Sequence, residues 1–314
     1  MTVIDEGVLA CPCAHKEVLI REAEGYRCSR SGCAHAQPEG RFPLINGKPI
    51  LISTGNCDTL CDPTRVKSYV RRSKESPLRR FYQARIVGVS RTTIANCAAF
   101  VGELKQRSKR PRVLVIGSGE QGAGTGALFS DADIAIVGLD IYESGSVDVV
   151  ADAHYLPFED ESFDGVWIQA VLEHVLEPAV VVSEIHRVLN KEGVVYAETP
   201  FMQQVHEGGY DFTRFTVLGH RYLFKRFDCI SIGGNRGVGV AFSWSLKYAV
   251  WAITRSRHVS QIFYALSILW ARLIDRLAAR ASLFDGSSGV FFLGTKSDKA
   301  LRHADIPPLY KGLQ

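Results

Sequence analysis

The stretch R-V-L-V-I-G-S-G-E-Q-G, residues 112–122, tells most about the fold of this chain. A strand-forming run leads directly into a glycine turn, G-x-G-x-x-G, where the backbone must turn sharply and pass close to a ligand. A second apolar run ends on Asp140, and a third ends just before Asp152. Because the carboxyl ends of parallel strands share one edge of a sheet, this succession predicts a nucleotide-shaped pocket at that edge.

Strand-like runs alternate with helical periods from Arg112 onward, which predicts an α/β fold with a doubly wound, mostly parallel sheet. One helix has Pro178 in its first turn, an apolar stripe over 181–189, and Gly193 after its end. The seven expected strands are 112–116, 134–139, 147–151, 163–168, 193–198, 227–232 and 289–295.

Composition divides the 314 residues into unequal parts. Residues 1–56 are rich in cysteine, glycine and proline and predict a small β domain. Residues 57–110 predict a basic helical linker, with a helix from about Thr92 to Gln106. Residues 111–300 form the main domain, with a helical insertion at 238–284 before the last strand, and a C-terminal tail follows at 301–314.

The net charge of +4 hides an uneven distribution. Residues 65–110 hold 13 Lys/Arg and two acids, a balance of +11, which leaves 24 Lys/Arg and 31 acids, or −7, elsewhere. The basic block either attracts a polyanion or forms the solvated face of linker helices. The sequence shows no secretory signal and no apolar run long enough to span a membrane, so we expect a cytoplasmic protein.

Two runs of sequence resemble class I S-adenosylmethionine-dependent methyltransferases of the type-11 group. The first, from Ala151, is A-D-A-H-Y-L-P-F-E-D-E-S-F-D-G-V-W-I-Q-A-V-L-E-H-V, and the second, from Glu184, is E-I-H-R-V-L-N-K-E-G-V-V-Y-A-E-T-P. The resemblance covers about 113–227. It implies a methyltransferase with a Rossmann-like sheet and S-adenosylmethionine as cofactor. The implied cofactor contacts are Gly117, Ser118 and Gly119 at the methionine portion, Asp140 at the ribose with Ile141 next to it, Asp152 and Ala153 at the adenine, and Gln169 beside the cofactor.

Other interpretations of this pocket stay open. NAD(P) shares the glycine motif and the need for an acid such as Asp140 at its ribose. Val115 stands where the family usually has an acid, and Gln121 lengthens the glycine turn by one residue. The chain could therefore be a non-catalytic binding or scaffold protein that keeps the methyltransferase fold.

Four cysteines near the start, with the tail F-P-L-I-N-G-K-P-I-L over 42–51, resemble the small zinc-ribbon type of the Trm112-like family. The resemblance implies a structural zinc ion, since four protein ligands leave no open position. The cysteine spacings depart from that pattern, so His15 or His35 are alternative ligands, and a metal-free remnant with buried thiols is another alternative. The expected ligands are Cys11, Cys13, Cys28 and Cys33.

The loop after the fifth strand, T-P-F-M-Q-Q-V-H-E-G-G-Y-D-F-T-R-F-T over 199–216, should overhang the transferred methyl group. His206 is the predicted general base, because a neutral imidazole can take a hydroxyl proton near pH 7; alignment alone is the alternative. Asp211 and Arg214 either bind substrate or form an ion pair that shapes the loop. His174 either lies where the acceptor enters or orders a helix start.

These observations predict methyl transfer to an oxygen of a small molecule, or of a glycan or lipid precursor. The alternative is an RNA methyltransferase whose basic linker and ribbon bind phosphates. The insertion at 238–284 holds Trp244, Trp251 and Trp270 and several arginines. It fits a peripheral membrane contact, a homodimer surface, or a cap over the active site.

Overall fold

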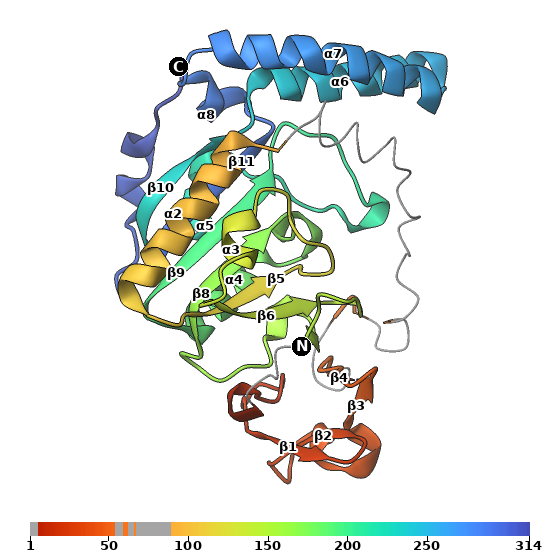
Figure 1. Ribbon diagram of the computed structural model, residues 1–314, viewed down its shortest axis with the longest axis vertical. Coiled ribbons are helices and arrows are strands. Elements are labelled where there is room, and N and C mark those ends of the chain that lie inside the picture. The colour runs from red at the N-terminus through yellow and green to blue at the C-terminus, as the bar shows by residue number, and fades with distance from the viewer. Residues whose placement is uncertain (1–5, 54–58, 62–65, 67–88) are drawn as a thin grey trace.

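The computed structural model describes residues 6–53, 59–61, 66 and 89–314 (Figure 1). Its centre is a seven-stranded sheet in the order β10-β11-β9-β8-β5-β6-β7. The last strand, β11, is antiparallel to both neighbours, and the pairs from β9 to β7 are parallel. The strands are β5 (Arg112–Ile116), β6 (Ala135–Asp140), β7 (Val149–Val150), β8 (Phe163–Gln169), β9 (Leu189–Pro200), β10 (Phe227–Asn235) and β11 (Gly289–Lys296).

The prediction of a mostly parallel doubly wound sheet is confirmed, and each of the seven expected strands is present. Gly193 was expected just after a helix, but it lies inside β9, which already begins at Leu189. The early start has a physical cause. The Lys296 ammonium donates to the Leu189 carbonyl at 2.6 Å, and the Asn190 amide donates to Asp164 at 2.9 Å, so the chain is held beside β8 from its first residue.

Helices cover both faces of the sheet (Figure 1). On one face lies α2 (Arg91–Arg107), the helix expected from Thr92 to Gln106, which packs Phe100 and Leu104 against Trp167. Ser90 caps it by accepting a hydrogen bond from the Thr93 amide at 3.2 Å. On the other face α4 (Pro178–Val188) and α5 (Val217–Leu223) complete a second apolar cluster.

The N-terminal part is a four-stranded antiparallel sheet that shares the second apolar cluster with the main sheet. Its strands are β1 (Leu19–Glu22), β2 (Gly25–Cys28), β3 (Phe42–Ile45) and β4 (Lys48–Pro49). Backbone hydrogen bonds tie it to the larger sheet, from the Ala10 amide to the Pro157 carbonyl at 3.0 Å and from the Leu51 amide to the Val150 carbonyl at 2.7 Å.

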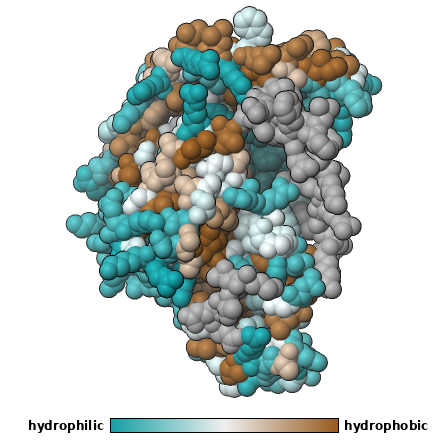
Figure 2. Space-filling model, viewed as in Figure 1, coloured by the Kyte–Doolittle hydropathy of each residue, from teal (hydrophilic) through white to brown (hydrophobic). Residues whose placement is uncertain are grey.

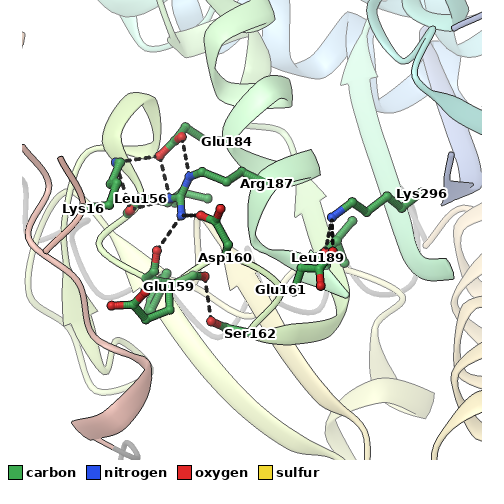
Figure 3. Close-up of polar contacts among 11 residues, drawn as sticks. Lys16, Leu156, Glu159, Asp160, Glu161, Ser162, Glu184, Arg187, Leu189 and Lys296 are labelled. Carbon is green, nitrogen blue, oxygen red and sulfur yellow. Dashed lines mark hydrogen bonds and ion pairs between the residues drawn. The ribbon is translucent and has the colours of Figure 1, made fainter. Parts of the chain in front are cut away.

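A polar network strengthens this junction (Figure 3). The Arg187 guanidinium on α4 donates to both carboxylate oxygens of Glu184, to Asp160, and to the carbonyls of Leu156 and Phe158. Lys16, from the N-terminal part, donates to the same Glu184 at 2.9 Å and to the Leu156 carbonyl at 3.3 Å. Arg187 thus fixes the loop that receives the N-terminal domain.

A helical hairpin occupies one end of the molecule (Figure 1). It consists of α6 (Val238–Thr254) and α7 (Arg257–Leu277) and is followed by α8 (Ser282–Gly286). The outer face of α7 carries many exposed apolar side chains, visible as brown atoms over the hairpin in Figure 2. Among the described residues, no helix is long and apolar enough to cross a membrane. Eight of the 13 Lys/Arg between Arg65 and Arg110, and Cys57, lie outside the described residues.

Candidate functional site

The glycine turn lies directly against the acid at the end of β6. Gly117 has a φ of +79°, a conformation that glycine adopts without strain. The Gly119 amide donates to one carboxylate oxygen of Asp140 at 2.7 Å, and the Ile141 amide donates to the other at 2.7 Å. A Cβ on Gly119 would lie 2.7 Å from the Asp140 carboxylate, so the approach requires glycine. Burial raises the pKa of Asp140, and these amides oppose the rise.

The other side of the turn meets the end of β8. The Gln169 amide donates to the Ala123 carbonyl at 3.3 Å, and a Cβ on Gly122 would collide with the Gln169 side chain. The Ser118 hydroxyl is buried and has no hydrogen-bond partner in the part of the chain that the structure describes. The hydroxyl faces Gly138 of β6, where an added Cβ would lie 2.7 Å from it.

The helix that follows the turn does not suit a dinucleotide. It is α3 (Gly126–Phe129), which has four residues and begins well beyond the glycines. In dinucleotide-binding proteins a helix starts at the turn, and its N-terminus binds the pyrophosphate. The geometry therefore favours a cofactor without a pyrophosphate.

Asp152 and Ala153 follow β7, beside Asp140. The Asp152 carboxylate accepts hydrogen bonds from the His154 amide at 2.9 Å and from the Thr59 hydroxyl, and the His154 ring lies 2.6 Å away. Burial would raise the pKa of Asp152, but these contacts outweigh it and lower the pKa. Ala153 is buried next to it. The structure thus gathers the expected cofactor residues at the carboxyl ends of β5 to β8.

A second group of polar side chains lies beyond the carboxyl ends of β8 and β9. Glu173 and His174 end the short 3-10 helix after β8, and His206 comes from the loop after β9. The Phe212 amide donates to the Glu173 carbonyl at 2.8 Å, which holds that loop over the strand ends. One Glu173 carboxylate oxygen lies 3.6 Å from Nε2 of His174 and 3.7 Å from Nε2 of His206.

Burial dominates the electrostatics of this group. Glu173 is fully buried, and burial raises its pKa to about 8. Burial also lowers the pKa of His206, as does the neighbouring His174. Neither carboxylate oxygen of Glu173 has a hydrogen-bond partner within the described ranges. An acid in this state is uncommon in a protein interior unless it has a function.

Asp211 and Arg214 form the ion pair that was one of their two expected roles. The Arg214 guanidinium contacts both oxygens of Asp211, one of them at 2.7 Å. Asp211 also accepts a hydrogen bond from the His206 amide at 2.7 Å, so the pair shapes the loop around His206.

Two cavities adjoin the loop after β9. One of about 460 Å³ is lined by residues of the loop, Asp211 and Arg214 among them, and by Tyr248 of α6. A smaller one of about 120 Å³ is lined by Glu173, His206 and Glu198, among others. Sequence reasoning did not select Glu173 or Glu198 as site residues. Their signal was an acid at or just after the carboxyl end of a strand.

The four N-terminal cysteines form a compact group. Their sulfur atoms all lie within 4.8 Å of one another, and Sγ of Cys11 is 3.9 Å from Sγ of Cys33. A tetrahedral zinc ion with Zn–S bonds of about 2.3 Å requires sulfur pairs about 3.8 Å apart, so the group fits zinc. The alternative ligands do not take part. His35 contacts the Gly40 carbonyl and the Ser53 hydroxyl, each at 2.7 Å, and His15 is exposed.

Part of the chain matches a known protein family. The model of a family described as "Methyltransferase domain" matches residues 114–197, from β5 into β9. No curated protein matches the chain. Similar solved structures include phosphoethanolamine N-methyltransferase 2 of Haemonchus contortus in complex with S-adenosyl-L-methionine (17% identity, 80% of this chain and 62% of that one, TM-score 0.44). Another is a SAM-dependent methyltransferase from Archaeoglobus fulgidus (17% identity, 69% and 99%, TM-score 0.42).

Proposed function

This chain carries a methyltransferase domain of the S-adenosylmethionine-dependent class, and we propose that it methylates an oxygen of a small molecule, or of a glycan or lipid precursor. The buried group around Glu173 and His206, which lines a cavity beside the cofactor residues, carries this proposal. Gln169 and Ala170 join the two halves of the site. Gln169 contacts the glycine turn, and Ala170 lines the acceptor cavity.

S-adenosylmethionine, when bound, supplies a methyl group on a positively charged sulfur. We assign Gly117, Ser118 and Gly119 to its methionine portion, because this turn lies between Asp140 and Gln169 at the carboxyl end of β5. Asp140, with Ile141 beside it, is assigned to the ribose. The adenine end is assigned to Asp152 and Ala153, and Gln169 to the junction with the acceptor cavity.

His206 is assigned to the reacting oxygen of the acceptor. Its Nδ1 lies 3.2 Å from the Asp211 carboxylate, which favours a proton on Nδ1 and leaves the lone pair on Nε2. Nε2 points toward Glu173, in the wall of the smaller cavity. His174, Asp211 and Arg214 are assigned to the acceptor pocket, where the ion pair holds His206 in place.

The cavities favour a compact acceptor over an RNA backbone. Their lining combines the carboxylates of Glu173, Glu198 and Asp211 with the guanidinium groups of Arg214, which is paired with Asp211, and Arg236, so it offers phosphates no excess of positive charge. The basic linker, on which an RNA substrate depends, lies mostly outside the described residues. We therefore propose a hydroxylated small molecule or precursor.

We propose a structural zinc ion in the N-terminal domain, which is 1–56 in our division of the chain. The four buried sulfur atoms support it by their spacing. The ion would lie in the domain that Lys16 and Arg187 attach to the main sheet, far along the chain from the acceptor loop. Its expected role is therefore to fold this domain.

For the hairpin we propose contact with an anionic membrane surface, at the cytoplasmic side. Residues 236–281 hold seven Lys/Arg and a single acid, Asp275. An isologous dimer would place two such basic faces together, whereas anionic lipid would attract them. The large apolar side chains exposed along α7 are Ile262, Phe263, Leu266, Leu269, Trp270, Leu273, Ile274 and Leu277. Co-sedimentation with anionic but not with neutral vesicles supports this contact, and dimers without vesicle binding contradict it.

Two measurements test the proposed function. Calorimetry with S-adenosylmethionine should show one site per chain, and a lack of binding would favour a non-catalytic scaffold. Transfer of labelled methyl groups should then occur to hydroxylated small molecules, sugars or lipid precursors. Methylation of RNA alone would contradict the proposed acceptor while leaving the enzyme class intact.

A further inference from the structure

Glu173, His174 and His206 have the arrangement of a metal-binding site that the reaction class itself does not call for. Each offers one ligand atom, and the three atoms lie within 4.8 Å of one another. Two neutral imidazoles and one carboxylate are donors that first-row divalent transition metals bind well. The two segments that supply them are 32 residues apart, so the folded loop creates the group.

His174 is oriented as metal ligands usually are, and His206 has a carboxylate beside its second ring nitrogen. In metal sites that nitrogen donates its proton to a carbonyl or a carboxylate, which fixes the ring and the tautomer. Nδ1 of His174 is hydrogen-bonded to the Tyr210 carbonyl at 2.6 Å, whereas Nδ1 of His206 lies 3.2 Å from the Asp211 carboxylate without hydrogen-bond geometry. Asp211 is itself held by Arg214. Each Nε2 therefore presents its lone pair toward Glu173.

The third donor is the buried carboxylate of Glu173. Its exposed fraction is zero, and neither of its oxygens accepts a hydrogen bond from the described residues. A buried charge without a partner is costly, and a cation at this point removes the cost. Arg214, the nearest arginine in this loop, is already paired with Asp211 and is not hydrogen-bonded to Glu173.

The spacing allows an ion with small adjustments. Metal–nitrogen bonds of about 2.1 Å place neighbouring ligand atoms roughly 3.0–3.4 Å apart. The Glu173 oxygen is 3.6 Å and 3.7 Å from the two Nε2 atoms, so the side chains need to close by only a few tenths of an ångström. Three protein ligands leave positions open toward the cavity.

We propose that Glu173, His174 and His206 bind a divalent transition-metal ion that coordinates the acceptor. The ion would bind the hydroxyl oxygen of the acceptor at an open coordination position. Binding of the metal is independent of the proposed function, whereas coordination of the acceptor rests on the proposed O-methylation. Coordination lowers the pKa of a bound hydroxyl, so the O–H proton passes to solvent. The oxygen then forms the new bond to the methyl carbon, and the electron pair of the broken C–S bond stays on sulfur. In this scheme His206 serves as a ligand, and no general base is needed.

Manganese binding to the full chain, followed by electron paramagnetic resonance, tests the site. Mn²⁺ prefers nitrogen and oxygen ligands, so the four cysteines do not compete for it. We expect one Mn²⁺ per wild-type chain. Glu173→Gln should lower the affinity for Mn²⁺ at least about 100-fold, because losing a ligand should cost more than losing a residue that supports a ligand, which costs about 10–100-fold. Asp211→Asn should cost about 10–100-fold. Glu192→Gln, at an exposed position, is the matched control and should bind as wild type does.

Two results overturn the proposal: no Mn²⁺ uptake by a wild-type chain that binds S-adenosylmethionine, or equal uptake by Glu173→Gln. Circular dichroism checks that each variant is folded. If Glu173→Gln does not fold, His174→Ala replaces it, since that side chain is partly exposed. Calorimetry with S-adenosylmethionine on the same samples separates the two proposals, because failure of the cofactor to bind contradicts the proposed function and leaves the metal result to stand by itself.

Discussion

His220 on α5 should make this protein lose stability in mild acid. The side chain is fully buried between Phe215 and Phe224, with ring centroids 5.8 Å and 5.2 Å away. Neither ring nitrogen has a hydrogen-bond partner among the described residues. Burial lowers the pKa of His220 from 6.5 to about 3, because an imidazolium there would lose its hydration without gaining a partner.

The sign of the pH effect follows from this difference. The unfolded chain takes up a proton on His220 below pH 6.5, whereas the folded chain does so only near pH 3. Between these values the unfolded state binds more protons, so the free energy of unfolding falls as the pH falls. From about pH 7.5 to about pH 5 the linkage amounts to about 2 kcal/mol for this residue alone.

His220→Leu removes this linkage and keeps nearly the same volume. At neutral pH the effects of repacking and of losing two unsatisfied nitrogens oppose each other, at about 1–3 kcal/mol each. The informative quantity is therefore the change with pH. Urea unfolding at the two pH values should show a decrease about 2 kcal/mol smaller in the variant than in wild type.

His258→Leu is the control, because His258 is exposed on α7. It should keep the wild-type pH dependence. Acid effects shared by all three proteins cancel in the comparison. Equal decreases for wild type and His220→Leu would refute the assignment of a neutral, unpartnered imidazole at this position.

Three further predictions concern the junction, the cysteines and the cofactor. Arg187→Ala should lower the free energy of unfolding, measured in urea, by about 3–5 kcal/mol, because it leaves Glu184 without its main partner in a largely buried network. Arg302→Ala is the control: it breaks an exposed ion pair and should leave the free energy of unfolding unchanged. Cys28→Ser should reduce the zinc content measured by mass spectrometry, and the exposed Cys229→Ser should not. Asp140→Asn should weaken S-adenosylmethionine binding in calorimetry about 10–100-fold, because one hydrogen bond to a charged group contributes about that much. Unchanged affinity would contradict the assignment of Asp140 to the cofactor pocket.

Local sequence signals predicted the sheet well because its strands are buried on both faces. Such strands appear as uninterrupted apolar runs, and β5, β6 and β8 were found within one or two residues. Boundaries set by distant contacts were missed. Leu189 begins β9 early because Lys296, more than a hundred residues later, binds its carbonyl. No local pattern carries that information.

The cofactor half of the site was more predictable than the acceptor half for a similar reason. Gly119 and Asp140 are marked by a turn and a strand end, and their contact follows from adjacent parallel strands. Glu173 also follows a strand end, but no local pattern shows that its carboxylate is buried. Its importance appears only when the loop that carries His206 folds over it and leaves the carboxylate buried without a partner.

The choice of acceptor must lie largely outside the segment that matches the methyltransferase family. Residues 114–197 contain the glycine turn, Asp140 and Glu173, which we assign to the cofactor and to one corner of the proposed acceptor cavity. His206 and the Asp211–Arg214 pair lie beyond this segment, and Tyr248 of α6 contacts the Val205 carbonyl at 2.9 Å. The hairpin therefore forms a wall of the larger cavity as well as an apolar outer surface. The exposed apolar side chains belong to α7 and the cavity wall belongs to α6, so the packed pair of helices connects the two, which supports the lipid-precursor form of the acceptor that we propose.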